Sequence, residues 1–495
     1  MSTSHVEAPA GAAHEKQNLA PRRFKTRHLS MMALGTAIGA GFFLGTGQAI
    51  YEAGPAVLIS YGLAAFIAVS VMYALAEMAA ALPSTGSFST YAQAGIGRWA
   101  GFTVGWLYWF MLMMVLGMEI TGAAEIFVKW FPAVPQWSVA LAIVVVFGGV
   151  NLLAAGDFGE VEAWLAGIKV FAIIAFLVIA VGLLTGIIPG REAPIADTVL
   201  GHGGWIPNGL TGIAVGILAV ITSFGGIEVV TIAAAEAEDA RTAISRAIRS
   251  VIWRILIFYV GTVALLVCLL PWNSEQMRGT PLATVLDMAG VPNVGLIMEV
   301  IVFIALVSAF SAIIYSSSRL AYSLSARNMG MRWLLGKDAI IPEVVRRSSA
   351  ESGLGAVVAG EAAAGDMSHG RTPRRAVSVS IALSLVSVAL NWWLPDVLLG
   401  ILINAIGMIL LVVWVFIIVA QMRLRPQLEQ AGALSIRMPG WPVLPWVVLV
   451  CLAALGVLMA TTEAGRGQLL AMGGLTVVVI ALFFIRQWWL KQFAH

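Results

Sequence analysis

The sequence predicts an all-α polytopic membrane protein with twelve transmembrane helices. Of its 495 residues, 60% are hydrophobic and only 11% are charged, whereas a soluble globular domain has about 25% charged residues. The mean hydropathy is +0.91. Long apolar runs recur along the whole chain, and most reach the length of about 20 residues that a helix needs to cross a bilayer.

The spans are separated by polar segments, and prolines such as Pro55, Pro207 and Pro271 stand at or near their ends, where the lost N–H is tolerated. Their approximate ranges are 30–50, 55–82, 99–127, 138–155, 161–187, 209–234, 250–270, 294–324, 376–394, 397–421, 441–461 and 467–489.

The basic residues predict the orientation. With the N-terminus inside, the outer loops hold only Lys129, Arg191, Arg278 and Arg466 of the 29 Lys and Arg residues. Lys169 lies within a span, and the others fall on the inner side. Because cytoplasmic loops carry an excess of Lys and Arg, we expect a multi-pass protein of the cell membrane with both termini in the cytoplasm.

Two segments are expected outside the membrane. Residues 1–28 form a cytoplasmic tail and not a signal peptide, since the first apolar run is too long and no Ala-x-Ala site follows it. Residues 29–490 form the transmembrane domain. Within it, residues 331–373 form a flexible cytoplasmic loop, because a Gly/Ala/Ser stretch lies between arginines that would face anionic lipid.

The first span, residues 30–50, contains glycine at positions 35, 39, 41, 45 and 47. Each glycine costs a helix roughly 1 kcal/mol relative to alanine. One interpretation is a helix break near Gly39-Ala40-Gly41, whose opened backbone binds a ligand at the bilayer midplane. The other is close helix packing through the Gly-xxx-Gly spacings at 35–39 and 41–45.

A second interruption favours the break. Span six contains Thr222-Ser223-Phe224-Gly225-Gly226-Ile227-Glu228, five spans after the first. Glycine-interrupted helices at corresponding positions of two halves indicate an inverted-repeat transporter. Repeat one covers about 30–187 and repeat two about 209–421, while the last two spans, about 441–489, lie outside the repeat.

Two broken helices also suggest a ligand. The N–H groups at the start of a half-helix suit a carboxylate, since the positive end of the helix dipole lies there. The carbonyls at the end of a half-helix suit an ammonium group. We therefore expect a zwitterion that carries both groups, which is an amino acid.

Three ionisable residues lie within spans, where charge is costly and usually functional: Glu119, Lys169 and Glu228. The alternative for the two acids is a buried, hydrogen-bonded carboxylate that holds helices together. Burial disfavours a charged amine, so Lys169 is expected to gain and lose a proton during transport; the alternative is a fixed, paired cation. Glu77, near the inner end of span two, is expected to be structural.

Nothing in the sequence indicates an enzyme. All six histidines lie outside the spans, and no His-Glu-x-x-His motif or aspartate dyad is present. Cys268 and Cys451 have neither disulfide nor metal-site spacing. We expect no metal, no cofactor, no nucleic-acid partner and no obligatory protein partner.

The chain resembles the amino acid permeases of the amino acid–polyamine–organocation (APC) superfamily, and most of all bacterial 4-aminobutyrate (GABA) permeases. The resemblance covers about residues 27–330, continues more weakly to the end, and is interrupted at 331–373 by a loop longer than usual. The segments that carry it include AIGAGFFLG (37–45), EAGPAVL (52–58), LAEMAAALPSTGSFSTYAQAGIGRWAG (75–101), GWLYW (105–109), VVTIAAAEAED (229–239) and SRLAYSLSARN (318–328).

The resemblance implies a LeuT-like five-plus-five fold with helices 1 and 6 broken at midplane. It implies that the backbone of Ile38, Gly39, Ala40 and Gly41 binds the substrate carboxylate. The amine would be received by the carbonyls of the segment Thr222, Ser223, Phe224 and Gly225, beside Gly226. Glu119 and Glu228 would complete the site.

The resemblance also implies roles for two further positions. Lys169 matches a lysine that occupies the place of a sodium ion in proton-driven relatives. Thr222 stands where some relatives have a bulky aromatic gate, so Phe224 becomes the candidate occluding residue.

The function expected from the resemblance is secondary active transport across the cytoplasmic (inner) membrane. The chain would take up GABA or a similar small zwitterionic amino acid by alternating access, as a symport with a proton as coupling ion. The alternatives are an amino-acid exchanger or a permease for another neutral amino acid. Side-chain specificity would depend on a pocket among spans 1, 3, 6, 8 and 10.

Overall fold

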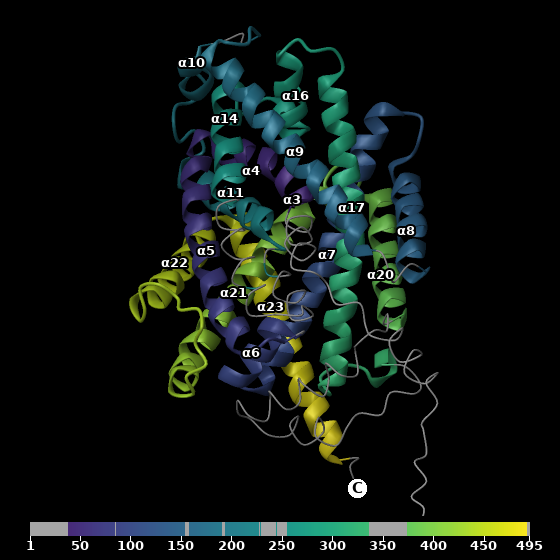
Figure 1. Cartoon of the computed structure of the whole chain (residues 1–495), viewed down its shortest axis with the longest axis vertical. Helices are drawn as coiled ribbons and strands as arrows, with labels where there is room; N and C mark the ends of the chain where they lie inside the picture. Colours follow the sequence, from purple (N-terminus) through teal and green to yellow (C-terminus); the bar gives the residue numbers. More distant parts are fainter. Residues whose placement is uncertain are drawn as a thin grey trace, which may run out of the picture.

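The computed structural model describes residues 38–84, 86–153, 158–190, 194–226, 228, 244, 255–335 and 374–492. All regular secondary structure in this part of the chain is helical, and the helices form one bundle (Figure 1). The α-helices are α3 Ala40–Phe43, α4 Gly45–Ala53, α5 Val57–Ala81, α6 Ser87–Gly95, α7 Arg98–Trp130, α8 Gln136–Leu153, α9 Phe158–Thr185, α10 Ile195–Leu200, α11 Gly209–Phe224, α14 Gly261–Leu269, α15 Glu275–Arg278, α16 Pro281–Met288, α17 Val294–Ala326, α20 Arg374–Trp393, α21 Leu398–Gln430, α22 Val443–Ala460 and α23 Glu463–Gln492.

The expectation of a multi-pass membrane protein is confirmed at this level. Among the described residues, eight helical segments are long and apolar enough to cross a membrane, and three shorter apolar helices accompany them. Each of the twelve predicted ranges contains helical residues. The count of twelve stays a prediction, because residues 40–81 qualify as one segment and spans six and seven continue into residues outside the described part.

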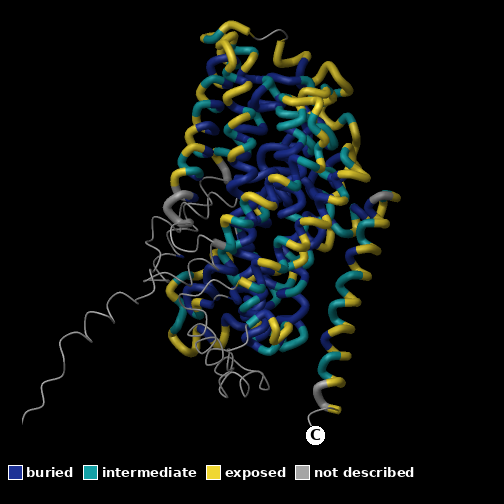
Figure 2. The backbone as a smooth tube through the Cα atoms, turned by 90° about the vertical axis from the view of Figure 1, so that its right-hand side faces the viewer, coloured by how far each residue is buried: buried dark blue, intermediate teal, exposed yellow. Residues whose placement is uncertain are grey.

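The helices at the centre of the bundle are mostly buried, whereas those at its periphery are exposed. In the most apolar 18-residue stretch of α7, 72% is buried inside the protein, and the corresponding share is 67% in α17 and in α21. In α23 it is only 17%, and Figure 2 shows this last helix running along the outside of the molecule. The central helices α7, α17 and α21 are therefore the ones positioned to enclose a site.

Gly54 and Pro55 form the turn between α4 and α5, at the point where the sequence predicts the boundary between the first two spans. Gly54 adopts φ 65°, a left-handed conformation that glycine adopts without strain. A side chain there would also overlap Pro207. Pro55 follows in a short 3-10 helix, Gly54–Ala56, before α5 begins.

At both predicted interruptions a helix terminus is found. α3 begins at Ala40, with Gly39 in extended conformation before it. α11 ends at Phe224, followed by extended Gly225 and by Gly226 at φ 95°. The other half of each predicted broken helix, residues 30–37 of span one and residues 229–234 of span six, lies outside the described residues. The tail 1–28 and most of the loop 331–373 also lie outside them. The midplane breaks and the inverted repeat therefore stay predictions.

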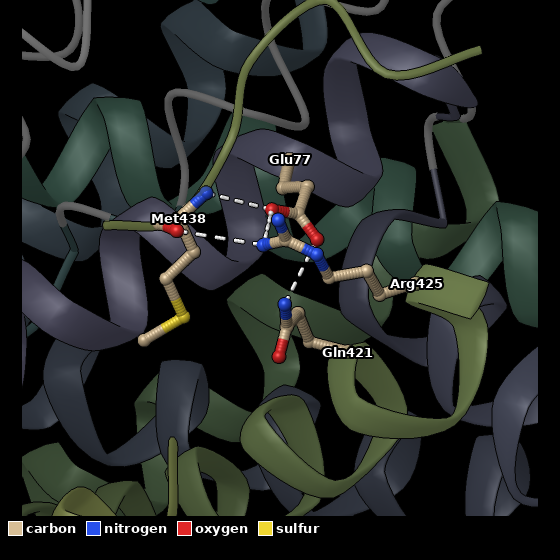
Figure 3. Close-up of polar contacts among 4 residues, drawn as sticks. All are labelled: Glu77, Gln421, Arg425 and Met438. Carbon is tan, nitrogen blue, oxygen red and sulfur yellow. Dashed lines mark hydrogen bonds and ion pairs between the residues drawn. The ribbon is translucent and has the colours of Figure 1, made fainter. Parts of the chain in front are cut away.

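A buried polar cluster joins the inner helices to the segment before α22 (Figure 3). Glu77 of α5 accepts hydrogen bonds from Gln421 Nε2 (2.8 Å) and Arg425 Nη1 (2.8 Å) of α21, and from the backbone N–H of Met438 (2.7 Å). The Glu77 carboxylate is fully buried. The predicted structural role of Glu77 agrees with this geometry.

Candidate functional site

The start of α3 is capped by an acid from another helix. The Ala40 N–H donates to both carboxylate oxygens of Glu119 on α7, at 3.1 Å each. Glu119 is buried. A side chain at Gly39 would overlap Glu119 Oε1, so glycine is required there by the close approach of α7. The positive end of the α3 backbone thus binds a carboxylate inside the protein.

The end of α11 packs directly on the backbone of α3. The Ser223 hydroxyl donates to the carbonyl of Gly41, and a Cβ at Gly41 would lie 2.8 Å from the carbonyl oxygen of Thr222. A Cβ at Gly45 would lie 3.3 Å from Ser223 Oγ. Close packing therefore explains Gly41 and Gly45 in part, as the second interpretation of the glycines proposed.

Thr222 and Glu228 tie this region to its neighbours. Thr222 Oγ1 donates to the carbonyl of Ile403 on α21, at 2.6 Å. Glu228 is fully buried and accepts from Trp414 Nε1 (2.9 Å), the Gly226 N–H (2.9 Å) and the Tyr108 hydroxyl (3.5 Å). Glu228 thus has the geometry of a hydrogen-bonded carboxylate that holds helices together.

A cavity lies between these helix ends. It is narrow, because the centre of a water-sized molecule can occupy only about 20 Å³ of it. Its polar side is formed by six residues that the sequence had singled out: Gly39, Gly41, Glu119, Thr222, Gly225 and Gly226. The rest of the lining, here called the apolar wall, consists of Met111, Leu112, Val115, Met118, Ile313 and Ile406. The lining comes from α3, α7, α11, α17 and α21, which lie in the expected spans 1, 3, 6, 8 and 10.

Sequence reasoning missed the apolar wall. Met111, Val115 and Met118 follow the i, i+4, i+7 spacing of one helix face, and Glu119 extends the same side of α7. This spacing is visible in the sequence. Because the other faces of a membrane helix are also apolar, the spacing alone does not distinguish residues that line a cavity from residues that face lipid.

The other predicted residues lie around the cavity and do not line it. Ala40 contributes its N–H to Glu119, and Ser223 bonds to Gly41. Ile38 is buried beside them. The ring of Phe224 packs against Tyr61 and Tyr259, with centroids 5.9 and 5.2 Å away. Its role as an occluding residue stays a prediction.

Lys169 is buried and interacts with two acids. It is 1% exposed, and its Nζ lies 3.8 Å from Glu162 Oε1 on the same helix, α9. Its positive charge also interacts with the negative charge of the Glu119 carboxylate. The sequence analysis did not identify Glu162; the available signal was its spacing of seven residues from Lys169, which places both on one face.

The arrangement offers the chemical groups that a small zwitterion with an uncharged remainder would require. The N–H at the start of α3 can bind a carboxylate, and the carbonyl end of α11 can bind an ammonium group. The apolar wall would accommodate methylene groups or an uncharged side chain. No group of three or more residues that could hold a metal ion occurs within the described ranges.

Comparisons with known proteins agree with this chemistry. The sequence matches the family model described as amino acid permease over residues 28–337 and 348–495. It is 44% identical over 466 residues to the aromatic amino acid transport protein AroP of Corynebacterium glutamicum, which covers 93% of this chain and 94% of that protein.

Two further relatives are gamma-aminobutyric acid permeases. The Bacillus subtilis protein is 36% identical over 474 residues, covering 95% of each chain. The Escherichia coli protein is 36% identical over 469 residues, covering 94% of each chain. Among solved structures, a mutant manganese transporter from Eremococcus coleocola has a similar fold, with a TM-score of 0.52 and 17% sequence identity over 97% of this chain and 98% of that one.

Proposed function

This chain belongs to the amino acid permease family and is a membrane transporter, not an enzyme, and we propose that it takes up a neutral zwitterionic amino acid together with a proton. GABA is the first candidate substrate. The proposal includes the finer topology: twelve spans, cytoplasmic termini, and two inverted repeats that alternate access around broken helices 1 and 6. The transporter fold of the structural neighbour supports it.

The observation that carries the proposal is the bond between the Ala40 N–H and Glu119. Glu119 occupies the position at which the substrate carboxylate would bind. Two carboxylates at one N–H group repel each other, so the substrate can replace Glu119 only when the negative charge of Glu119 is removed. A proton on Glu119 weakens its bond to the N–H and frees the start of α3. Substrate and proton then favour each other's binding, which is the requirement for symport.

Lys169 supplies the second step of this coupling. A neutral Lys169 amine can accept the proton from Glu119 after the substrate has left. Nζ then becomes an ammonium, and the Glu119 carboxylate returns to the Ala40 N–H. The interaction between the charges of Lys169 and Glu119 supports a coupling between these two groups.

The apolar wall indicates the substrate class. Its six apolar side chains would leave a charged side chain of the substrate unsolvated, which is costly. An aromatic amino acid is the second candidate. The relative at 44% identity is named for aromatic amino acid transport, and Met111 and Met118 are flexible enough to adapt to a ring.

Competition for uptake tests this function. Purified protein in liposomes is given labelled GABA with an excess of unlabelled GABA, phenylalanine, tryptophan, lysine or glutamate. We expect neutral amino acids to reduce uptake by at least tenfold and lysine and glutamate to leave it within twofold. Equal competition by charged amino acids would contradict the proposal, and the strongest neutral competitor identifies the preferred substrate.

Lys169→Ala tests the coupling. We expect accumulation driven by a pH gradient to fall at least tenfold, because the proton acceptor beside Glu119 is lost. Counterflow against internal substrate should persist. The matched control is Lys129→Ala, at the exposed end of α7. Undiminished pH-driven accumulation in Lys169→Ala would contradict the coupling, and wild-type protein that only exchanges would support the exchanger alternative.

A further inference from the structure

The two oxygens of the Glu162 carboxylate are in different situations. Glu162 is 1% exposed, near the first residue of α9. Its Oε2 accepts a 2.6 Å hydrogen bond from Ser308 Oγ on α17. Its Oε1 has no hydrogen bond among the described residues, and it lies 3.8 Å from Lys169 Nζ. Leaving a buried acceptor without a hydrogen bond is costly, so a purely structural carboxylate would be expected to use both oxygens.

Glu162, Lys169 and Glu119 form an ordered series. Seven residues separate Glu162 from Lys169, which is two turns or about 10 Å along α9. Glu119 lies at the cavity, and Lys169 interacts with both acids. α9 runs from Phe158 to Thr185, and the chain after Thr185 leads to α10 at the edge of the molecule (Figure 1). Glu162 is the fifth residue of α9 and therefore lies toward its other end, at Phe158.

The other charged groups on the packed elements are engaged elsewhere. Among the described helices, α14, α16 and α17 make the main contacts with α9. Glu299 of α17 accepts from Trp130 and Thr280, and Arg319 of α17 stacks on Tyr315. Asp287 of α16 accepts from the Gly295 N–H. α14 contains no charged residue. On α9 itself, the side chain of Glu160 lies outside the described residues.

We propose that Glu162 is the residue to which Lys169 passes its proton, so that the coupling path runs from the substrate cavity to the Phe158 end of α9. The inference rests on the proposed proton coupling. In the step, an N–H bond of the Lys169 ammonium breaks and an O–H bond forms at Glu162 Oε1. A charged pair becomes a neutral amine and a neutral acid, and the net charge is unchanged.

The geometry sets a condition for this transfer. A hydrogen bond between nitrogen and oxygen is about 2.9 Å long, so the two side chains approach by roughly 1 Å, or one water molecule bridges them. The neutral amine is then ready to receive the next proton from Glu119. Ser308 keeps the Glu162 carboxyl pointed at Lys169.

Glu162→Gln tests the proposal, because Gln keeps the size of the side chain and cannot accept the proton. Substrate-driven proton entry is measured with a pH-sensitive dye inside liposomes, and counterflow is measured in parallel. We expect proton entry to fall at least tenfold with counterflow within twofold of wild type. Glu299→Gln on α17 is the matched control and should leave both unchanged. Proton entry at the wild-type rate in Glu162→Gln would overturn the inference.

Ser308→Ala keeps the test decisive if Glu162→Gln does not fold or loses counterflow as well. It preserves both charges and removes only the hydrogen bond to Oε2. A carboxylate without that donor holds a proton more tightly, so the pH dependence of uptake should move at least half a unit toward higher pH. An unmoved pH profile would overturn the inference. Wild-type protein without substrate-driven proton entry would instead overturn the proposed coupling itself.

Discussion

At the residue scale, Gly39 decides what can bind at the start of α3. It lines the cavity, and the space where its side chain would lie is taken by Glu119 Oε1. In the proposed mechanism, the same space receives the substrate carboxylate when Glu119 moves away. A methyl group at this position would therefore exclude both carboxylates in turn.

Gly39→Ala should reduce substrate affinity. We expect KM for the labelled substrate, measured on the folded protein, to rise at least tenfold, because the methyl group occupies the carboxylate position. Gly62→Ala on α5 is the control, since a Cβ there meets no atom within 4 Å. The same KM in Gly39→Ala and Gly62→Ala would show that the start of α3 does not bind substrate.

The polar side of the site was largely predictable from the sequence, and its partners were not. Glycines and an acid within apolar runs identify Gly39, Glu119 and Gly225 without any contact information. The bond between Glu119 and the Ala40 N–H joins residues 79 positions apart. Such a contact depends on how α7 packs against α3, which hydropathy does not encode.

At the element scale, the cluster around Glu77 shows how α5, α21 and the segment before α22 are held together. Arg425 also donates to the carbonyl of Met438 (3.4 Å) and lies over the ring of Trp441. The ion pair between Glu77 and Arg425 is almost fully removed from solvent. Breaking one side of such a pair leaves an uncompensated buried charge, which costs about 3–5 kcal/mol.

Glu77→Gln should therefore destabilise the protein strongly. We expect the melting temperature of the purified protein to fall by several degrees, and Glu77→Gln combined with Arg425→Met to recover much of the loss, because no unpaired charge remains. Glu275→Gln, an exposed acid on α15, is the control. Equal melting temperatures for Glu77→Gln and Glu275→Gln would show that the buried pair does not hold these elements.

At the scale of the whole molecule, hydropathy predicted the order of the helices better than their ends. The predicted span 397–421 corresponds to α21, which continues to Gln430, and the span 294–324 corresponds to α17, which continues to Ala326. The apolar pattern of a span ends near the membrane surface. The hydrogen-bonded backbone of the helix can continue beyond it, so the helices are longer than the predicted spans. The short helices α6, α10 and α16 were not predicted, because they are too short to give a span signal.

The orientation in the membrane follows from charge alone and needs its own test. Cys268 and Cys451 are first replaced by serine. Arg466→Cys, at the exposed start of α23, should then react with a membrane-impermeant maleimide on intact cells, whereas Arg374→Cys, also exposed, should react only after permeabilisation. The reason is that three predicted spans lie between the two positions, which places them on opposite sides, and the excess of Lys and Arg places Arg374 on the inner side. Labelling of both in intact cells would contradict the twelve-span topology, and the reverse pattern would place the Phe158 end of α9 outside. The proton that Glu162 is proposed to receive would then leave on the wrong side for uptake, so this one experiment also decides the direction of the coupling path.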